Sequence, residues 1–72
     1  MTNTELLDKK IEESGKKIGY LAEKCGLSLA GFYNCRTNKA EFKASHIKIL
    51  SEELGITSLK EKDQIFFAHD GA

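Results

Sequence analysis

The 72-residue sequence predicts a single all-α domain, a compact bundle of five short helices. Proline, valine and tryptophan are absent, so the chain lacks helix breakers and has few residues that favour β-strands. Apolar residues recur at intervals of three and four along most of the chain, which is the spacing of one helical face. Glycines and short polar stretches divide this pattern into five segments, all within one domain over residues 1–72.

The first helix is expected at the N-terminus. Thr2 and Glu5 have the T-x-x-E spacing of a capping box, in which two residues satisfy each other's backbone N–H groups at a helix start. The helix is expected to run to about Ser14 and to stop at Gly15. Its predicted apolar face consists of Leu6, Leu7 and Ile11.

A second, short helix is predicted over about residues 17–25, and Gly26 is expected to end it in the left-handed conformation. Its apolar positions are Ile18, Leu21, Ala22 and Cys25. Ser28 can cap a third helix that runs to about Thr37. The inward positions of this third helix are Phe32 and Cys35, with Leu27 packing from the turn.

A polar connection, residues 38–41, separates the third helix from a fourth that opens at Ser45 or nearby and stops at Gly55. The predicted apolar face of the fourth helix is Ile47, Leu50 and Leu54. Ser58 and Glu61 form a second capping-box pattern, which predicts the start of a last helix. The apolar residues of this helix are Leu59, Ile65, Phe66 and Phe67.

The sequence does not favour an enzyme or a metalloprotein. Cys25 and Cys35 are ten residues apart, and no Cys-x-x-Cys pair of a zinc or redox site is present. His46 and His69 are expected in separate helices without a paired spacing. Both cysteines fall on apolar helix faces, where a free thiol behaves as a small hydrophobe. We therefore expect no catalytic residues, metal, cofactor or small-molecule substrate.

The net charge is zero, but the charges are unevenly placed along the chain. Residues 1–13 carry two lysines against four acidic residues, and residues 49–72 carry two lysines against five. Residues 14–48 carry six lysines and Arg36 against two glutamates. A basic middle between acidic ends is typical of a segment that faces nucleic acid, although a solvated helical surface would have the same composition.

Two further features concern the compartment. The longest apolar run is far shorter than the ~18 residues that a membrane span requires, so no membrane association is expected. The N-terminus lacks the charged and then apolar pattern of a signal peptide. The expected location is therefore the cytoplasm, where the thiols remain reduced.

The second and third predicted helices have the features of a helix-turn-helix unit, with Ala22 as the small residue at the crossing and Gly26 in the turn. The run LAEKCGLS, residues 21–28, resembles the L-A-E-K-x-G-[VIL]-S signature of the Cro/lambda-repressor-like helix-turn-helix family. The run LSEELGIT, residues 50–57, is similar to a later helix end of that family. The resemblance covers about residues 5–67. It implies five helices in the lambda-repressor-like DNA-binding fold, with the third helix in the major groove.

In this arrangement the outward residues of the third helix form the recognition surface. They are Ser28, Leu29, Ala30, Tyr33, Asn34 and Thr37. Asn34 can pair with adenine, and the hydroxyl groups can bind a base or a phosphate. The cations expected to contact phosphates or the rim of the surface are Lys16, Lys17, Arg36, Lys39 and Lys43.

The chain departs from the family pattern at both helices of the unit. Lys17-Ile18-Gly19 replaces the glutamine that usually opens the second helix, and Leu29-Ala30-Gly31 replaces the polar residues beside the capping serine. An apolar helix tip is a poor reader of polar base edges. The same surface could dock onto another protein, because exposed apolar patches mark such contacts.

Two functions follow from this surface. One is a Cro-type regulator that binds operator DNA directly as a dimer. The other is a regulator that binds a phage repressor, and the chain also resembles the small modulator-of-repression proteins of temperate phages. That resemblance implies action as an anti-repressor or co-repressor in the lysis–lysogeny switch. The apolar tip and the zero net charge favour the repressor-binding function, while the oligomeric state is left open.

Overall fold

The computed structural model describes residues 1–68, and within this range it contains five α-helices and no β-strand. The helices are α1 (Thr4–Ser14), α2 (Ile18–Lys24), α3 (Leu29–Arg36), α4 (Ala44–Leu54) and α5 (Leu59–Phe66). The predicted all-α bundle of five short helices is confirmed. No helix in residues 1–68 is long and apolar enough to cross a membrane. His69, which the sequence pattern places in a helix, lies outside the described residues.

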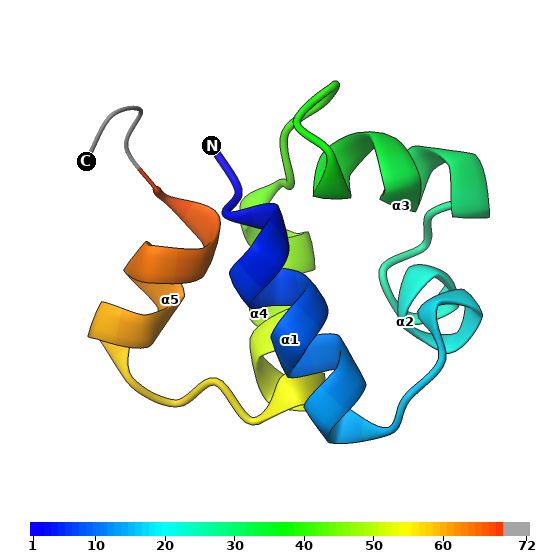
Figure 1. Ribbon diagram of the computed structural model, residues 1–72. Helices are drawn as coiled ribbons and strands as arrows, with labels where there is room; N and C mark the ends of the chain where they lie inside the picture. Colours follow the sequence, from blue (N-terminus) through cyan, green and yellow to red (C-terminus); the bar gives the residue numbers. More distant parts are fainter. Residues whose placement is uncertain (69–72) are drawn as a thin grey trace.

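The helices α1 and α4 occupy the middle of the molecule, with α5 packed on one side and α2 and α3 on the other (Figure 1). Each helix contributes one apolar side chain that is fully buried at the centre. These five residues are Leu7, Leu21, Phe32, Leu50 and Ile65. Phe42, in the connection between α3 and α4, contacts the rings of Phe32 and Phe66 edge-on, with centroids 5.7 and 5.8 Å away. One shared core therefore fixes the positions of all five helices.

The helix ends follow the predicted pattern where glycine or serine marks them. Gly15, Gly26 and Gly55 have φ angles of 71°, 71° and 70°, a conformation that other residues rarely adopt. Ser28 and Ser58 accept hydrogen bonds, each 3.0 Å long, from the backbone N–H three residues further on. They are the N-caps of α3 and α5, as predicted.

The predicted start of α1 is wrong by one residue. The N-cap is Asn3, whose Oδ1 accepts a hydrogen bond of 3.1 Å from the backbone N–H of Leu6. Thr2 does not cap the helix, because its backbone pairs with the side chain of Asn38. The capping-box spacing of Thr2 and Glu5 is therefore coincidental, and a tertiary contact takes its place.

The helix α4 begins at Ala44, next to the predicted start at Ser45 or nearby. Lys43 is its N-cap residue, and the backbone N–H of Lys43 donates to Nδ1 of His46 over 3.2 Å. The imidazole thus satisfies one of the backbone donors that a helix start leaves open.

Four apolar residues of the predicted helices are exposed: Leu6, Ile18, Leu59 and Phe67. The helices α2 and α5 have only seven and eight residues, so each offers about two turns and few inward positions. In α5 the core takes Ile65 and Phe66. Leu59 is its first residue and is 78% exposed, while Phe67 is its C-cap residue and is 50% exposed.

Candidate functional site

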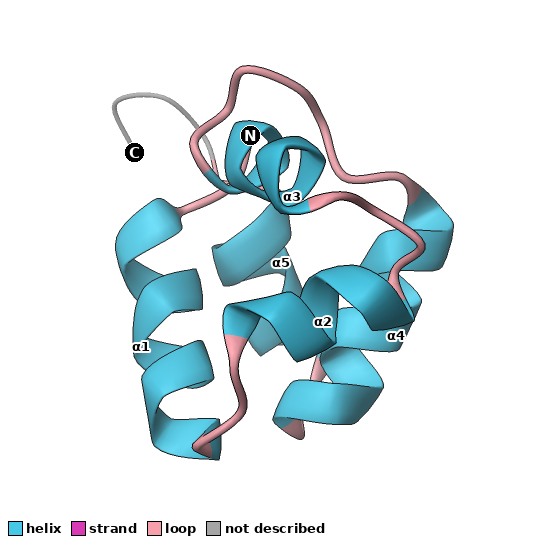
Figure 2. Ribbon diagram, turned by 90° about the vertical axis from the view of Figure 1, so that its right-hand side faces the viewer, coloured by secondary structure: helices cyan, strands magenta, loops and turns pink. Residues whose placement is uncertain are grey.

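The helices α2 and α3 and the turn between them form one end of the molecule, opposite α5 (Figure 2). The turn is closed by backbone hydrogen bonds from Gly26 to Glu23 and from Leu27 to Ala22, which are 3.0 and 2.9 Å long. Ala22, the residue predicted at the helix crossing, is buried. The partly buried Leu27 packs against the core from the turn. These contacts hold the outer face of α3 toward solvent.

An apolar surface spans the start of α2 and the outer face of α3, and we call it the α2–α3 patch: Ile18, Gly19, Leu29, Ala30 and Tyr33. Leu29 is 63% exposed, Tyr33 50% and Ile18 39%. A Cβ atom at Gly19 would meet Cδ2 of Leu29 at 4.0 Å, so the two helices approach each other here. Gly19 has no side chain, and Leu29 lies exposed beside it.

The predicted base-reading hydroxyl groups make hydrogen bonds within α3. Ser28 accepts from the N–H of Gly31, and Thr37 donates from Oγ1 to the carbonyl of Tyr33 over 2.8 Å. Asn34 keeps an exposed side chain on the same helix. Leu29, Ala30, Tyr33 and Asn34 are thus brought to one surface, and each of the two hydroxyl groups already makes one hydrogen bond within the chain.

Arg36 is predicted to contact phosphate, but it is held by α1. Its Nη1 lies 2.7 and 2.8 Å from the two carboxylate oxygens of Asp8, and its side chain is only 19% exposed. Its backbone carbonyl accepts a hydrogen bond of 2.6 Å from Oγ1 of Thr4. The guanidinium also lies 5.4 Å from the ring centroid of Tyr33, within the range of a cation–π contact. Arg36 therefore fixes an exposed ring of the patch.

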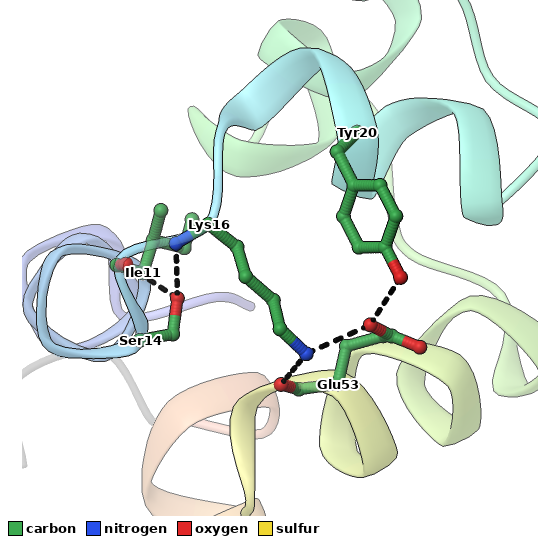
Figure 3. A network of polar contacts seen from close by, with 5 residues as sticks. All are labelled: Ile11, Ser14, Lys16, Tyr20 and Glu53. Atoms are coloured by element: carbon green, nitrogen blue, oxygen red, sulfur yellow. Dashed lines mark hydrogen bonds and ion pairs between the residues drawn. The ribbon is translucent and has the colours of Figure 1, made fainter.

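Lys16 is likewise neutralised within the chain (Figure 3). Its Nζ lies 2.7 Å from the carbonyl oxygen and 2.9 Å from Oε1 of Glu53, which also accepts a hydrogen bond of 2.9 Å from the hydroxyl of Tyr20. The hydrogen bonds from Lys16 and then Tyr20 lower the pKa of the Glu53 carboxyl group. Ser14 donates to the carbonyl of Ile11 and accepts from the N–H of Lys16, which orients the start of this segment.

The other three predicted cations, Lys17, Lys39 and Lys43, are exposed and form no ion pair within residues 1–68. Lys17 and Lys43 are the N-cap residues of α2 and α4. The Nζ atom of Lys39 lies 5.7 Å from the ring centroid of Tyr33. The predicted set of five cations therefore divides into two that are paired internally and three that are available.

Two residues of this surface were not predicted from the sequence. Tyr20 is 42% exposed on α2, and Nζ of Lys24 lies 5.6 Å from its ring centroid. Lys16 lies 5.9 Å from the same centroid. Lys16, Tyr20 and Lys24 are spaced by four residues, and this i, i+4 spacing of cation and aromatic ring is a signal that could have found them.

The thiols lie beneath this surface. Cys25 and Cys35 are buried and free, and burial raises the pKa of each thiol. Sγ of Cys35 lies 3.7 Å from the carbonyl oxygen of Glu41, to which it donates. Within residues 1–68, no group of three His, Cys, Asp or Glu side chains is arranged to hold a metal ion. The cysteines thus act as apolar core residues.

The site as a whole offers exposed apolar side chains, cations fixed on aromatic rings and an exposed amide. Such a surface is suited to contact with a macromolecule. Comparison of the chain with models of protein families, with curated proteins and with solved structures finds no match.

Proposed function

We propose that this protein is a helix-turn-helix transcriptional regulator that acts by binding a partner protein, a phage repressor, through the α2–α3 patch. The observation that carries the proposal is the exposure of Leu29, 63%, at the first position of the helix expected to recognise the target. Gly19 of α2 lies beside this side chain, and the half-exposed ring of Tyr33 extends the apolar surface along α3. Contiguous apolar groups of this kind mark protein contacts.

The polar groups of the same surface also support a protein partner over DNA. Direct DNA binding draws its affinity from cations on phosphates and its specificity from polar side chains on base edges. Arg36 and Lys16 already have carboxylate partners, and the hydroxyl groups of Ser28 and Thr37 each make one hydrogen bond within the chain. Two of the five predicted cations are therefore less available to a duplex.

Direct operator binding is the alternative, and one observation favours it. Asn34 is exposed on α3, and Lys17, Lys39 and Lys43 are exposed and have no carboxylate partner within residues 1–68. An asparagine can read adenine while lysines contact the phosphates. This function requires that Asn34→Ala relax the preference for one base pair by about 1–3 kcal/mol. It also requires binding that weakens steeply with salt.

A pair of matched variants tests the proposal. Leu29 and Leu59 are both exposed, both are the first residue of an eight-residue helix, and both follow a serine N-cap. Aspartate therefore has the same local effect on the helix at either position. The two sites differ in that Leu29 belongs to the α2–α3 patch, whereas α5 lies on the opposite side of the molecule.

The measurement is capture of a purified temperate-phage repressor, with a gel shift of the protein alone on that repressor's operator DNA. We expect Leu29→Asp to weaken capture by about 30-fold or more, the loss of a hot spot worth about 2 kcal/mol, while Leu59→Asp captures as wild type. Circular dichroism confirms that both variants fold. Tight, sequence-specific operator binding by the wild-type protein alone at physiological salt would instead establish the DNA-binding alternative.

A further inference from the structure

Two aromatic rings, one on α2 and one on α3, have an ordered set of cations around them. Tyr20 on α2 and Tyr33 on α3 each have two cations within 6 Å of the ring centroid. In each pair, one cation is neutralised inside the molecule: Lys16 by Glu53, and Arg36 by Asp8.

The second cation of each pair is Lys24 or Lys39. Their Nζ atoms lie 5.6 and 5.7 Å from the centroids, and neither forms an ion pair within residues 1–68. A free lysine loses much side-chain entropy when it binds, but contact with an aromatic ring restricts it beforehand. The two rings therefore hold one available positive charge at the end of α2 and one just after the end of α3.

From this arrangement we infer that the α2–α3 patch receives an acidic amphipathic segment of the partner protein. The apolar side chains of that segment cover Leu29 and Tyr33, and its carboxylates pair with Lys24 and Lys39. This inference rests on the proposed function and specifies the chemistry of the partner. The sign of the charge follows from the cations of residues 16–43 that form no ion pair within residues 1–68. They are Lys17, Lys24, Lys39 and Lys43, against two acidic side chains, Glu23 and Glu41.

The apolar centre of the patch distinguishes this partner from DNA, which would also supply negative charge. Leu29 and Ala30 occupy the first two positions of α3, where a duplex would present polar base edges. An amphipathic protein segment places apolar side chains on these residues and carboxylates at the rim. The chain as a whole has zero net charge, so attraction for anions depends on this local group of cations.

The inference is tested by selection from a displayed library of random 16-residue helical peptides. The full-length wild-type protein is the bait, and the Leu29→Asp variant is used for counter-selection. We expect the recovered peptides to combine apolar residues at a spacing of three and four with a net negative charge. Since the net charge of the bait is zero, enrichment of acidic residues would indicate the local positive charge at the patch and not the charge of the whole protein.

The strongest peptide is then synthesised and its affinity measured with charge-reversal variants. Lys24→Glu and Lys39→Glu should each weaken binding about tenfold, and the effect should shrink at high salt. Lys60→Glu, at an exposed position of α5, is the matched control and should bind as wild type.

The outcomes separate the inference from the proposed function. Neutral or basic peptides that still depend on Leu29 would overturn the acidic partner but leave a protein-binding patch. Failure to recover any peptide that depends on Leu29 would also overturn the inference. The capture experiment with the repressor tests the proposed function independently. If a 20-base-pair duplex displaces the peptide and the protein also fails to capture the repressor, both the acidic partner and the proposed function are overturned.

Discussion

Thr2 and Asn38 form two reciprocal hydrogen bonds, although they are 36 residues apart in the sequence. The N–H of Thr2 donates to Oδ1 of Asn38 over 2.7 Å, and Nδ2 of Asn38 donates to the carbonyl of Thr2 over 2.9 Å. Asn38 has a φ angle of 68°, and it is the only non-glycine residue in the left-handed region within residues 1–68. The chain before α1 therefore holds the end of α3, which carries the α2–α3 patch.

Replacement of Asn38 separates the side-chain contact from the backbone conformation. Asn38→Gly retains the left-handed conformation but loses both hydrogen bonds, whereas Asn38→Ala loses both features. We expect each variant to lower the free energy of unfolding by about 1–3 kcal/mol, with the alanine variant the less stable. Urea titration measures the two values. Equal stability of wild type and Asn38→Gly would show that the contact with Thr2 contributes nothing.

Asp8 and Arg36 provide a second link between α1 and α3, and a double-mutant cycle can measure it. Arg36→Ala, Asp8→Ala and the double variant should show a coupling free energy of about 0.5–1 kcal/mol, since Asp8 is partly exposed and solvent weakens the pair. The coupling should decrease at high salt. Lys48→Ala is the control, because Lys48 is exposed on α4 and makes no ion pair within residues 1–68; its stability should match that of wild type.

The lowered pKa of Glu53 predicts that the free energy of unfolding depends on pH in the acid range. Its folded-state pKa is lowered by the hydrogen bonds from Lys16 and Tyr20, whereas in the unfolded chain the pKa is about 4.3. Its contribution to stability is therefore present above pH ~4.3 and lost as the pH falls through the folded-state pKa. We expect the difference in unfolding free energy between wild type and Glu53→Gln to shrink over this acid range. A difference that stays constant from pH 7 to pH 3 would contradict the assigned contacts.

The raised pKa values of the buried thiols predict that stability falls as the pH rises in the alkaline range. Desolvation raises the pKa of Cys25 and of Cys35 in the folded state above the value of about 8.5 in the unfolded chain. Their contribution to stability is present below pH ~8.5 and is lost as the pH rises toward the folded-state pKa values. Labelling with a disulfide reagent at pH 8 should be slow in the native protein and fast in urea. Rapid labelling of the folded protein would mean that the thiols are accessible.

Ser51 is buried in α4, and its hydroxyl group is the one buried side-chain polar atom without a hydrogen-bond partner in residues 1–68. An unsatisfied buried hydroxyl costs about 1–3 kcal/mol, and alanine removes it while leaving a similar volume. We expect Ser51→Ala to keep or raise the melting temperature. Ser58→Ala serves as a contrast, because that hydroxyl caps α5 and its loss should cost about 1 kcal/mol.

The sequence predicts those parts of the fold that depend on neighbouring residues. Gly15, Gly26 and Gly55 end helices as expected, since a left-handed φ angle favours glycine whatever surrounds it. The start of α1 was predicted less well, because Thr2 and Asn3 are both good caps and the choice between them depends on Asn38, far along the chain. A local pattern contains no information on such a contact.

In the candidate site, too, features set by neighbouring residues could be predicted, and features set by distant contacts could not. The exposure of Leu29 and Tyr33 follows from the helical register of α3, with Phe32 and Cys35 facing inward, as the sequence predicts. The engagement of Arg36 by Asp8 could not be predicted, because the partner lies on another helix. Short helices add to the difficulty: with about two turns in α2, the exposed position of Ile18 and its place in the patch depend on packing against other helices.

The two ends of the described chain meet. The N–H of Ala68 donates to the carbonyl of Met1 over 2.9 Å, and the N–H of Asn3 donates to the carbonyl of Ile65 over 2.6 Å. A short linker from Ala68 to Met1 could therefore close the polypeptide into a ring, and new termini could be opened in the exposed connection at Thr57. The resulting circular permutant would begin with α5, yet it would keep every contact that positions α3. The α2–α3 patch thus depends on the contacts between the helices and not on their order along the chain.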